Sequence, residues 1–232
     1  MSRRPAMGGG HLRRAALLAV GVLLVVLLPG VARADGGLKQ KPGTAGCVSE
    51  TGTAGACQDG VGLDTAYSLT VSPEGRSVYV ASGASDAVAV FDRDPATGAL
   101  TQKPGTAGCV SETGTGGACQ DGVALDGAIS VGASPDGRSV YVASVASDAV
   151  AVFDRDPATG ALTQKPGTAG CISETGTGGA CQDGVALDGA NAVSVSPDGR
   201  SVYVASMYSG AVAVLDRDPA TGALTQKPGT AG

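Results

Sequence analysis

Short runs of alternating side chains, separated by turn residues, dominate the chain after residue 34. In Ser139–Ala143 the valines point to one side of an extended chain and Tyr141 to the other. In Ala149–Phe153 the valines again share a side, and Phe153 lies opposite with two alanines. Both sides are largely apolar, so we expect strands in a sheet that is covered on both faces. The period is two throughout this region, which favours strands over helices.

The runs are separated by segments rich in Gly, Pro and Asp, which are turn residues for different stereochemical reasons. Pro135-Asp136-Gly137 precedes one apolar run, and Asp-Gly between two such runs is typical of a hairpin. Asp156-Pro157-Ala158-Thr159-Gly160 follows the next run. The spacing predicts four short strands joined by tight turns.

The pattern recurs every 62 residues, as shown by Cys47, Cys109 and Cys171. Prolines and tyrosines keep the same step without insertion or loss. We therefore divide residues 35–232 into a lead-in and three repeats, with the boundaries 38–46, 47–108, 109–170 and 171–232. Within the lead-in, Leu38–Gln40 resembles the last strand of a repeat and is expected to form a lone strand.

Four-stranded units whose two faces must be covered by neighbours are typical of β-propeller blades, so the fold class is all-β. A β-solenoid is the alternative, although 62 residues is long for one coil. The repeated segment "SPDGRSVYVAS…DAVAVFDRDPATGAL" resembles that of the YVTN-type, lactonase-like propeller family. This resemblance extends over nearly all of residues 38–232.

The resemblance implies a ring of about seven blades, closed by pairing of terminal strands. Three repeats and a lone strand do not complete such a ring, so we expect this chain to be a fragment of a larger propeller. Closure by self-association of three-bladed chains is the alternative. The family includes 6-phosphogluconolactonases and carboxymuconate-lactonising enzymes, whose sites use charged acid–base groups, histidine among them. Here the one histidine, His11, precedes the repeats, so no catalytic residue is carried over.

Residues 1–34 have the features of a secretory signal peptide. Four arginines precede a short apolar run, Ala15–Leu28, and Ala32-Arg33-Ala34 supplies a small-residue cleavage site. The run is shorter than the roughly 20 residues that span a bilayer, although an uncleaved anchor is the alternative. We therefore expect a secreted, cell-surface or periplasmic protein with no membrane span after cleavage.

Removal of this leader makes the chain strongly acidic. The leader holds five of the sixteen basic residues and no acid, which leaves eleven against twenty-one acids and a net charge of −10. Such a surface repels phosphate backbones, so nucleic acid is not an expected partner. A small molecule, a glycan or a protein remains as the candidate partner, and no cofactor is expected.

The six cysteines form three pairs with nine residues between the partners. In an exported chain this pattern predicts disulfides, and fifteen pairings are formally possible. The local pairing is favoured because it repeats identically and needs no contact between blades. It joins Cys47 to Cys57, Cys109 to Cys119 and Cys171 to Cys181. A metal site is disfavoured, because zinc sites use cysteines two to four residues apart together with further ligands.

Positions at which otherwise similar repeats differ are candidates for ligand binding. They fall on the first strand of each repeat and on the connection between its second and third strands, which shares a face with the cysteine loops in a propeller. We select Tyr67, Asn191, Met207 and Tyr208 as candidate ligand-binding residues. Drift at tolerant, exposed positions explains the same differences.

Pairs of acidic residues recur in every repeat, but neither kind of pair is a strong candidate for a metal or catalytic site. Calcium at pairs such as Asp154 and Asp156 is an alternative, but the turn D-x-D-P-x-T-G explains them without a metal. Acids of the cysteine loops, such as Glu112 and Asp121, are interpreted as a solvated rim. The sequence therefore favours a non-catalytic extracellular binding or scaffold module. A lactonase or cycloisomerase with its catalytic residues outside this chain is the alternative.

Overall fold

The computed structural model describes residues 37–229 and Gly232. The chain divides into two units, Met1–Lys39 and Gln40–Gly232, and every described strand lies in the second. The signal peptide predicted for residues 1–34 lies outside the described residues. Across the described part of the chain, no helix is long and apolar enough to cross a membrane.

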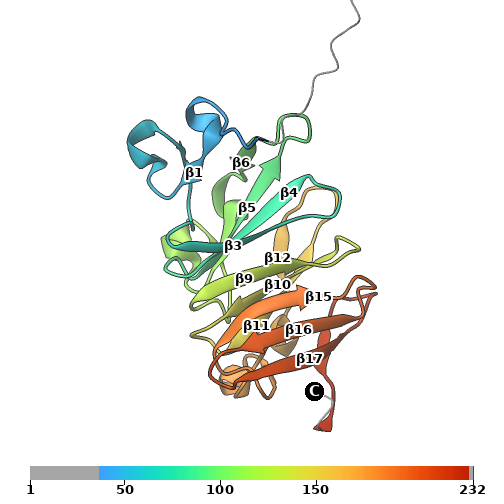
Figure 1. Cartoon of the computed structure of the whole chain (residues 1–232). Helices are drawn as coiled ribbons and strands as arrows, with labels where there is room; N and C mark the ends of the chain where they lie inside the picture. Colours follow the sequence, from blue (N-terminus) through green and yellow to red (C-terminus); the bar gives the residue numbers. More distant parts are fainter. Residues whose placement is uncertain (1–36, 230–231) are drawn as a thin grey trace, which may run out of the picture. The chain divides into compact units, whose positions relative to one another are not determined.

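Three large sheets of mainly antiparallel strands make up most of the second unit, and they stack in chain order (Figure 1). The first sheet contains β3 (Ala66–Val71), β4 (Ser77–Ser82), β5 (Ala87–Arg93), β6 (Leu100–Gln102), β7 (Cys109–Ser111) and β8 (Gln120–Asp121). The second contains β9 (Ala128–Ala133), β10 (Ser139–Ser144), β11 (Ala149–Arg155), β12 (Leu162–Gln164), β13 (Cys171–Ser173) and β14 (Gln182–Asp183). The third contains β15 (Ala190–Val195), β16 (Ser201–Ser206), β17 (Ala211–Arg217) and β18 (Leu224–Gln226).

Each sheet begins with a four-stranded antiparallel meander, which confirms the prediction of all-β propeller blades. The strands β3, β9 and β15, the first of each blade, run side by side (Figure 1). A short separate sheet pairs β1 (Val48–Ser49) with β2 (Gln58–Asp59). The helices are single 3-10 turns, namely η1 (Gly43–Gly46), η2 (Gly52–Gly55), η3 (Gly105–Gly108), η4 (Gly114–Gly117), η5 (Gly167–Gly170) and η6 (Gly176–Gly179).

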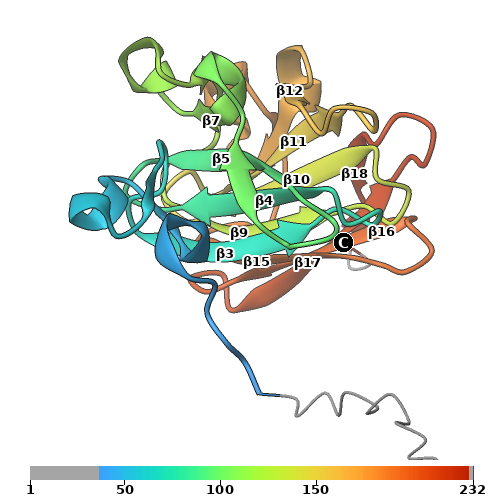
Figure 2. The same cartoon turned by 90° about the horizontal axis from the view of Figure 1, so that it is seen from above.

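The fourth strand of a blade is built in two pieces, which the sequence did not predict. In the first sheet, β6 pairs with the end of β5 (Figure 1). In contrast, β7 pairs with the beginning of β5, Ala87–Ala89 (Figure 2). The turn η3 lies between the two pieces. The cysteine loop, predicted to be only a connection between blades, therefore begins as a strand of the preceding blade, and the sheets are offset from the sequence repeats.

The lone strand predicted at Leu38–Gln40 is not formed. The equivalent residues of the repeats, Leu100–Gln102 and Leu162–Gln164, are strands because each pairs with the third strand of its own blade. Among the residues that the structure describes, no such strand precedes the lead-in, and a strand without a partner leaves its backbone hydrogen bonds unmade. The prediction was wrong because sequence likeness to a strand does not supply the neighbouring strand.

The cores lie between blades rather than within them. Val140 and Val142 face the first blade, where they pack in one cluster with Tyr79 and Val88. Tyr141, on the opposite side of the same strand, packs in a second cluster with residues of the third blade. This confirms the predicted division of faces, in which valines and tyrosine point to opposite sides. Each fully buried valine contributes roughly 1.5–3 kcal/mol to the free energy of unfolding.

Candidate functional site: the joints between blades and the loop face

A buried arginine joins each pair of neighbouring blades. Arg217, at the end of β17, is 3% exposed. Its Nε donates to Oη of Tyr141 (2.7 Å), and its Nη2 donates to Oδ2 of Asp136 (2.8 Å), both in the second blade. Nη1 donates to the carbonyl oxygen of Gly199 in its own blade (2.9 Å). The guanidinium therefore fastens the turn of one blade to the sheet of the next.

The same joint occurs between the first and second blades. Arg155 is 3% exposed, ion-pairs with Glu74 and donates from Nη1 to the carbonyl oxygen of Gly137 (2.8 Å). Tyr79 accepts from Nε of Arg155 and donates its own hydroxyl hydrogen to the carbonyl oxygen of Gly160 (2.8 Å). Gly160 has a φ of +74°, and a Cβ there would overlap Oγ of Ser77, so only glycine fits this approach.

Burial and hydrogen bonding at these joints shift the pKa values of their ionisable side chains. Burial alone would raise the pKa of Asp136, but hydrogen bonds from Ser134, Arg138 and Arg217 together hold it below its ordinary value. Burial is the main reason that the pKa of Tyr141 is raised, so its hydroxyl remains a donor at neutral pH. The joint is thus a fixed structural contact in which the carboxylate of Asp136 is charged and the hydroxyl group of Tyr141 is protonated at neutral pH.

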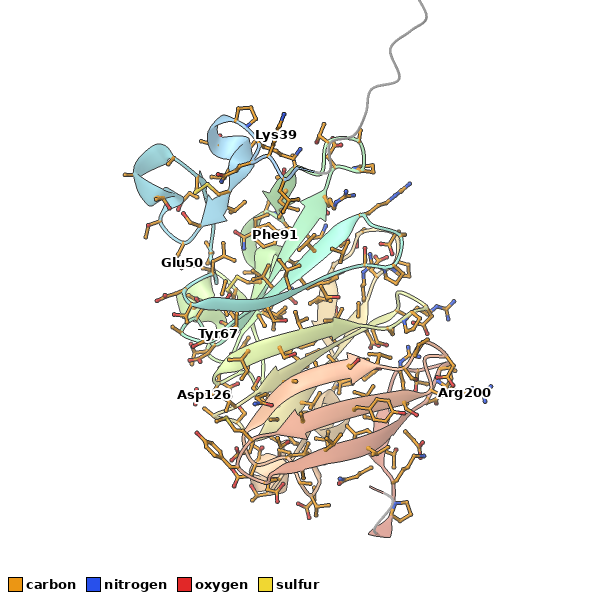
Figure 3. The ribbon with its side chains drawn as sticks, viewed as in Figure 1. Lys39, Glu50, Tyr67, Phe91, Asp126 and Arg200 are labelled. Atoms are coloured by element: carbon orange, nitrogen blue, oxygen red, sulfur yellow. A yellow bond between two sulfur atoms is a disulfide. The ribbon has the colours of Figure 1, made fainter. Side chains whose placement is uncertain are left out.

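On the turn face, a depression of about 340 Å³ lies between the first and second blades and includes Arg76, Asp92 and Arg155. Two of its charged side chains form ion pairs within the protein. Arg155 is paired with Glu74, and Asp92 is paired with Lys103 (2.6 Å). Arg200, the equivalent of Arg76 in the third blade, lies on the side of the stack away from Tyr67 and Asp126 (Figure 3).

On the opposite face, acids of the cysteine loops bind backbone rather than solvent alone. Oε2 of Glu112 accepts from the backbone nitrogen of Leu125 (2.6 Å), and Oε2 of Glu174 accepts from that of Leu187 (2.5 Å). Asp148, in the connection between β10 and β11, accepts from the backbone nitrogen of Gly189 in the next blade (2.7 Å). The interpretation of these glutamates as a solvated rim was wrong, because they close the loops.

Asp86 accepts from the backbone nitrogen of Gly127 in the next blade (2.8 Å), as Asp148 does from that of Gly189. A second aspartate lies next to each of these two acids. Burial and the neighbouring carboxylate of Asp86 raise the pKa of Asp126, and burial together with Asp148 and Glu174 raises that of Asp188. The loop face therefore carries a pair of close carboxylates at each joint. Burial, with the neighbouring carboxylate adding to it, makes the stability of this face depend on pH.

We expect Asp126→Asn to stabilise the chain at pH 7. Because the pKa of Asp126 is raised on folding, the folded state holds this proton more tightly than the unfolded state does. The free energy of unfolding therefore falls as the pH rises from about 3.9, the ordinary value, through the raised pKa. Urea denaturation should show a gain for Asp126→Asn at pH 7 that shrinks toward pH 3. The control is Asp64→Asn, at the same repeat position in the first blade.

The structure places the four candidate ligand residues on this loop face, at its two ends. Tyr67 on β3 is 65% exposed and lies over Gly83, whose added Cβ would be 2.8 Å from the ring. Met207 and Tyr208, in the connection after β16, are 53% and 67% exposed. Figure 3 shows Tyr67 on the same side of the stack as Glu50 and Asp126.

Two of these residues share a depression in the third blade. Asn191 and Met207 line an open hollow of about 320 Å³ together with Ser206 and Val212. Tyr208 lies beside them over Gly189, and Tyr67 belongs to the first blade and is not part of the hollow. The hydroxyl of Ser206 is buried without a hydrogen-bond partner, as are those of Ser82 and Ser144 at the equivalent positions.

The three predicted disulfides are all formed. Each bridge joins the local pair, with S–S lengths of 2.01, 1.99 and 1.99 Å. Cys109 and Cys171 lie in β7 and β13, so these bridges tie the cysteine loop to the sheet of the preceding blade. Three disulfides fit an oxidising compartment.

The acid pairs on the third strands do not act together. Oδ1 of Asp156 accepts from the backbone nitrogen of Ala158 (2.8 Å), which closes a turn, and hydrogen bonds of this kind lower its pKa. Asp154 instead ion-pairs with Lys165 (2.5 Å). Over residues 37–229, no three His, Cys, Asp or Glu side chains gather closely enough to hold a metal ion.

Comparison with known proteins relates this chain to propellers by structure. A candidate 6-phosphogluconolactonase from Bacteroides fragilis aligns with 76% of this chain and 41% of its own, at 22% identity and a TM-score of 0.54. A second, from Bacteroides uniformis, aligns with 69% of this chain and 38% of its own, at 24% identity and a TM-score of 0.50. No protein-family model and no curated protein matches the sequence.

These likenesses show the fold alone, and the blades have the lactonase-like propeller fold. The chain spans about two fifths of the length of these two structures. The buried arginines at the joints, Arg155 and Arg217, were missed from the sequence, although each continues the apolar alternation of its strand.

Proposed function

We propose that this chain is exported and acts by binding, as a scaffold module with a lactonase-like fold. The observation that carries the proposal is that the buried and partly buried charged groups of the blades are engaged in structural contacts. The buried charged side chains within residues 37–229 are Arg155 and Arg217, and both are held in joints between blades. The ordered loop-face glutamates close loops. A hydrolase needs a base within reach of a nucleophile or water, and here these groups have structural partners.

Exposed aromatic and sulfur-containing side chains on the loop face support a binding role. Tyr67, Met207 and Tyr208 are each more than half exposed, and such residues are enriched in binding surfaces. Export is supported by the composition of residues 1–34 and by the three disulfides, which persist in oxidising compartments.

The test compares binding with turnover. The purified chain is applied to a glycan array and, separately, incubated with 6-phosphogluconolactone while hydrolysis is followed. We expect retention of a subset of glycans, reduced about tenfold or more by Tyr208→Ala, and no hydrolysis above the spontaneous rate. The control is Arg138→Ala, which removes an exposed side chain on the turn face, away from the loop face. Hydrolysis that depends on the chain would contradict the proposal.

A lactonase is the second candidate, favoured by the shared fold of two candidate 6-phosphogluconolactonases. If hydrolysis is found, the turn-face depression is the place to examine, because Arg76 and Arg93 there have the charge to hold a phosphate. Loss of that activity in Arg76→Ala would assign the reaction to this depression.

A further inference from the structure

The first and third blades each leave part of one apolar face uncovered. On the first blade Leu69 is 62% exposed, whereas Val78 and Phe91 on the same face are buried in a cluster against which Val48 and Leu63 pack. On the third blade Tyr203 and Val212 are 42% and 59% exposed. At the equivalent positions of the second blade, Val131 and Tyr141 are 5% and 0% exposed, because neighbouring blades cover them. Apolar faces of this kind mark interaction surfaces.

We propose that these faces are the two halves of one interface, and that a second copy of this chain covers them. The third blade of one copy packs on the first blade of the next, as the first packs on the second within the chain. This partner rests on the proposed scaffold function and specifies how the scaffold assembles. The argument for a second copy is that the chain already contains this interface twice.

The apolar contacts of the new joint repeat those of the existing ones. The face that meets a following blade is the same in all three blades, with Tyr79, Ala81, Val88 and Val90 replaced in the third by Tyr203, Ala205, Val212 and Val214. The face that meets a preceding blade is also equivalent, with Val131, Val140 and Val142 replaced in the first by Leu69, Val78 and Val80. No new side-chain chemistry is needed for the two faces to fit.

The first and third blades also carry the polar groups of such a joint, and among the described residues these groups lack the cross-blade contacts that their equivalents make in the two existing joints. Arg93 stands at the position of Arg155 and Arg217, and its Nη1 donates to the carbonyl oxygen of Gly75 (2.9 Å), as theirs do in their own blades. Asp198 stands at the position of Asp136, which receives Arg217. In the proposed joint, Arg93 of one copy binds Asp198 and the hydroxyl group of Tyr203 in the other.

The strand edges match in the same way. Val88 pairs with Val110 of β7, and Val150 pairs with Ile172 of β13. At the equivalent place in the third blade, the first half of β17 pairs with β16 on one side only, while β1 pairs only with β2. The register of the existing joints places Val48 of the second copy opposite Val212.

Two segments of nearly the same sequence, residues 38–46 of the second copy and residues 224–232 of the first, compete for one position in the proposed joint. Residues 38–46 repeat most of the sequence of residues 224–232, and β18 already occupies the fourth-strand position beside β17. Gly232 also accepts from the backbone nitrogen of Val214 (2.8 Å). Residues 38–46 of the second copy therefore lie outside the joint, and its contribution begins near Cys47.

The joint completes the loop face. Cγ2 of Ile129 lies 3.5 Å from the Cβ position of Gly83 in the first joint. Tyr67 is the equivalent of Ile129 in the first blade, and Met207 is the equivalent of Gly83 in the third. The proposed joint therefore brings Tyr67 of one copy beside Met207 of the other. The hollow of Asn191 and Met207 is then the socket for a second chain, and all four candidate ligand residues meet at one place.

Two copies joined in this way at both ends supply six blades. Propellers typically have about four to eight blades, and a head-to-tail interface forms a closed ring when its rotation allows. A ring of two copies covers all four exposed apolar faces. We therefore infer a closed dimer.

The experiment measures mass in solution by sedimentation for the full chain in oxidising buffer. We expect a dimer, and Arg93→Glu, which turns a carboxylate toward Asp198 of the other copy, should raise its dissociation constant about tenfold or more. Asp198→Arg alone should do the same. Both substitutions in one chain restore the opposite charges at both joints and should restore the dimer.

The control is Arg76→Glu, which makes the same charge change on the turn face without entering the joint, and it should leave the dimer intact. Circular dichroism confirms that each variant is folded. A wild-type monomer at about 100 μM, or a dimer that neither Arg93→Glu nor Asp198→Arg weakens, would overturn the inference. Glycan retention and hydrolysis are measured independently of mass, so a monomer that still retains glycans would overturn this inference and leave the proposed function standing, and a dimer without glycan retention would do the reverse.

Discussion

Arg155→Ala is expected to lower the free energy of unfolding by about 2–3 kcal/mol. The substitution removes a 3% exposed guanidinium, leaves Glu74 without its ion-pair partner and removes the hydrogen bond that Tyr79 accepts at the first joint. Breaking a buried ion pair costs about 3–5 kcal/mol, and the side chain of Glu74 is 35% exposed, so the loss falls below that range. Urea denaturation, monitored by circular dichroism, gives the change from the midpoint at constant slope.

Arg93→Ala is the matched control. Arg93 has the same place in the first blade and keeps the bond to Gly75, but no acid lies within ion-pair distance among the described residues. Its loss is expected to cost about 1 kcal/mol, the usual contribution of a hydrogen bond. Both variants are measured below the dissociation constant for self-association. Equal losses would contradict the role of Arg155 in joining two blades.

The fold was predictable because its determinants are local and repeated. Alternation of valine with tyrosine in Ser139–Ala143 set the two faces of a strand, and both faces proved to be buried between blades. Turn residues marked the ends of the strands. The two-piece fourth strand was not predictable, because Cys109–Ser111 pairs with Ala87–Ala89 through an interruption whose sequence pattern is typical of a loop.

The joints were missed although the alternation contained the signal. Ala149, Ala151 and Phe153 share the face that packs on the first blade, and Arg155 continues that face by one more step of two. A charge in register with a buried apolar face needs a partner, and this partner comes from another blade. Asn191 and Met207 were found through their divergence between repeats, but that they share a hollow depends on the blade geometry.

Removal of the second disulfide, by Cys109→Ala together with Cys119→Ala, is expected to lower the free energy of unfolding by about 3 kcal/mol. The bridge closes a loop of roughly eleven residues, and its loss returns that conformational freedom to the unfolded chain. Both cysteines are buried, at 1% and 3% exposure, and Cys109 pairs with Ala89 in the first sheet. The loop therefore unfolds together with the blade, and urea denaturation should report the full effect.

The first disulfide provides the comparison that isolates this coupling. The bridge between Cys47 and Cys57 closes a loop of the same length, but β1 pairs only with β2. This loop is held to the first blade by side-chain contacts, such as Gln58 with Leu100, and by no strand pairing. For the chain kept monomeric, Cys47→Ala with Cys57→Ala should free the β1 and β2 amides to exchange rapidly. The free energy of unfolding of the blades should stay within about 1 kcal/mol of that of the original chain, because the first cysteine loop opens locally before the blades unfold. If the two double variants lowered the unfolding midpoint equally, loop closure alone would set the effect. Pairing of β7 with the blade would then add nothing.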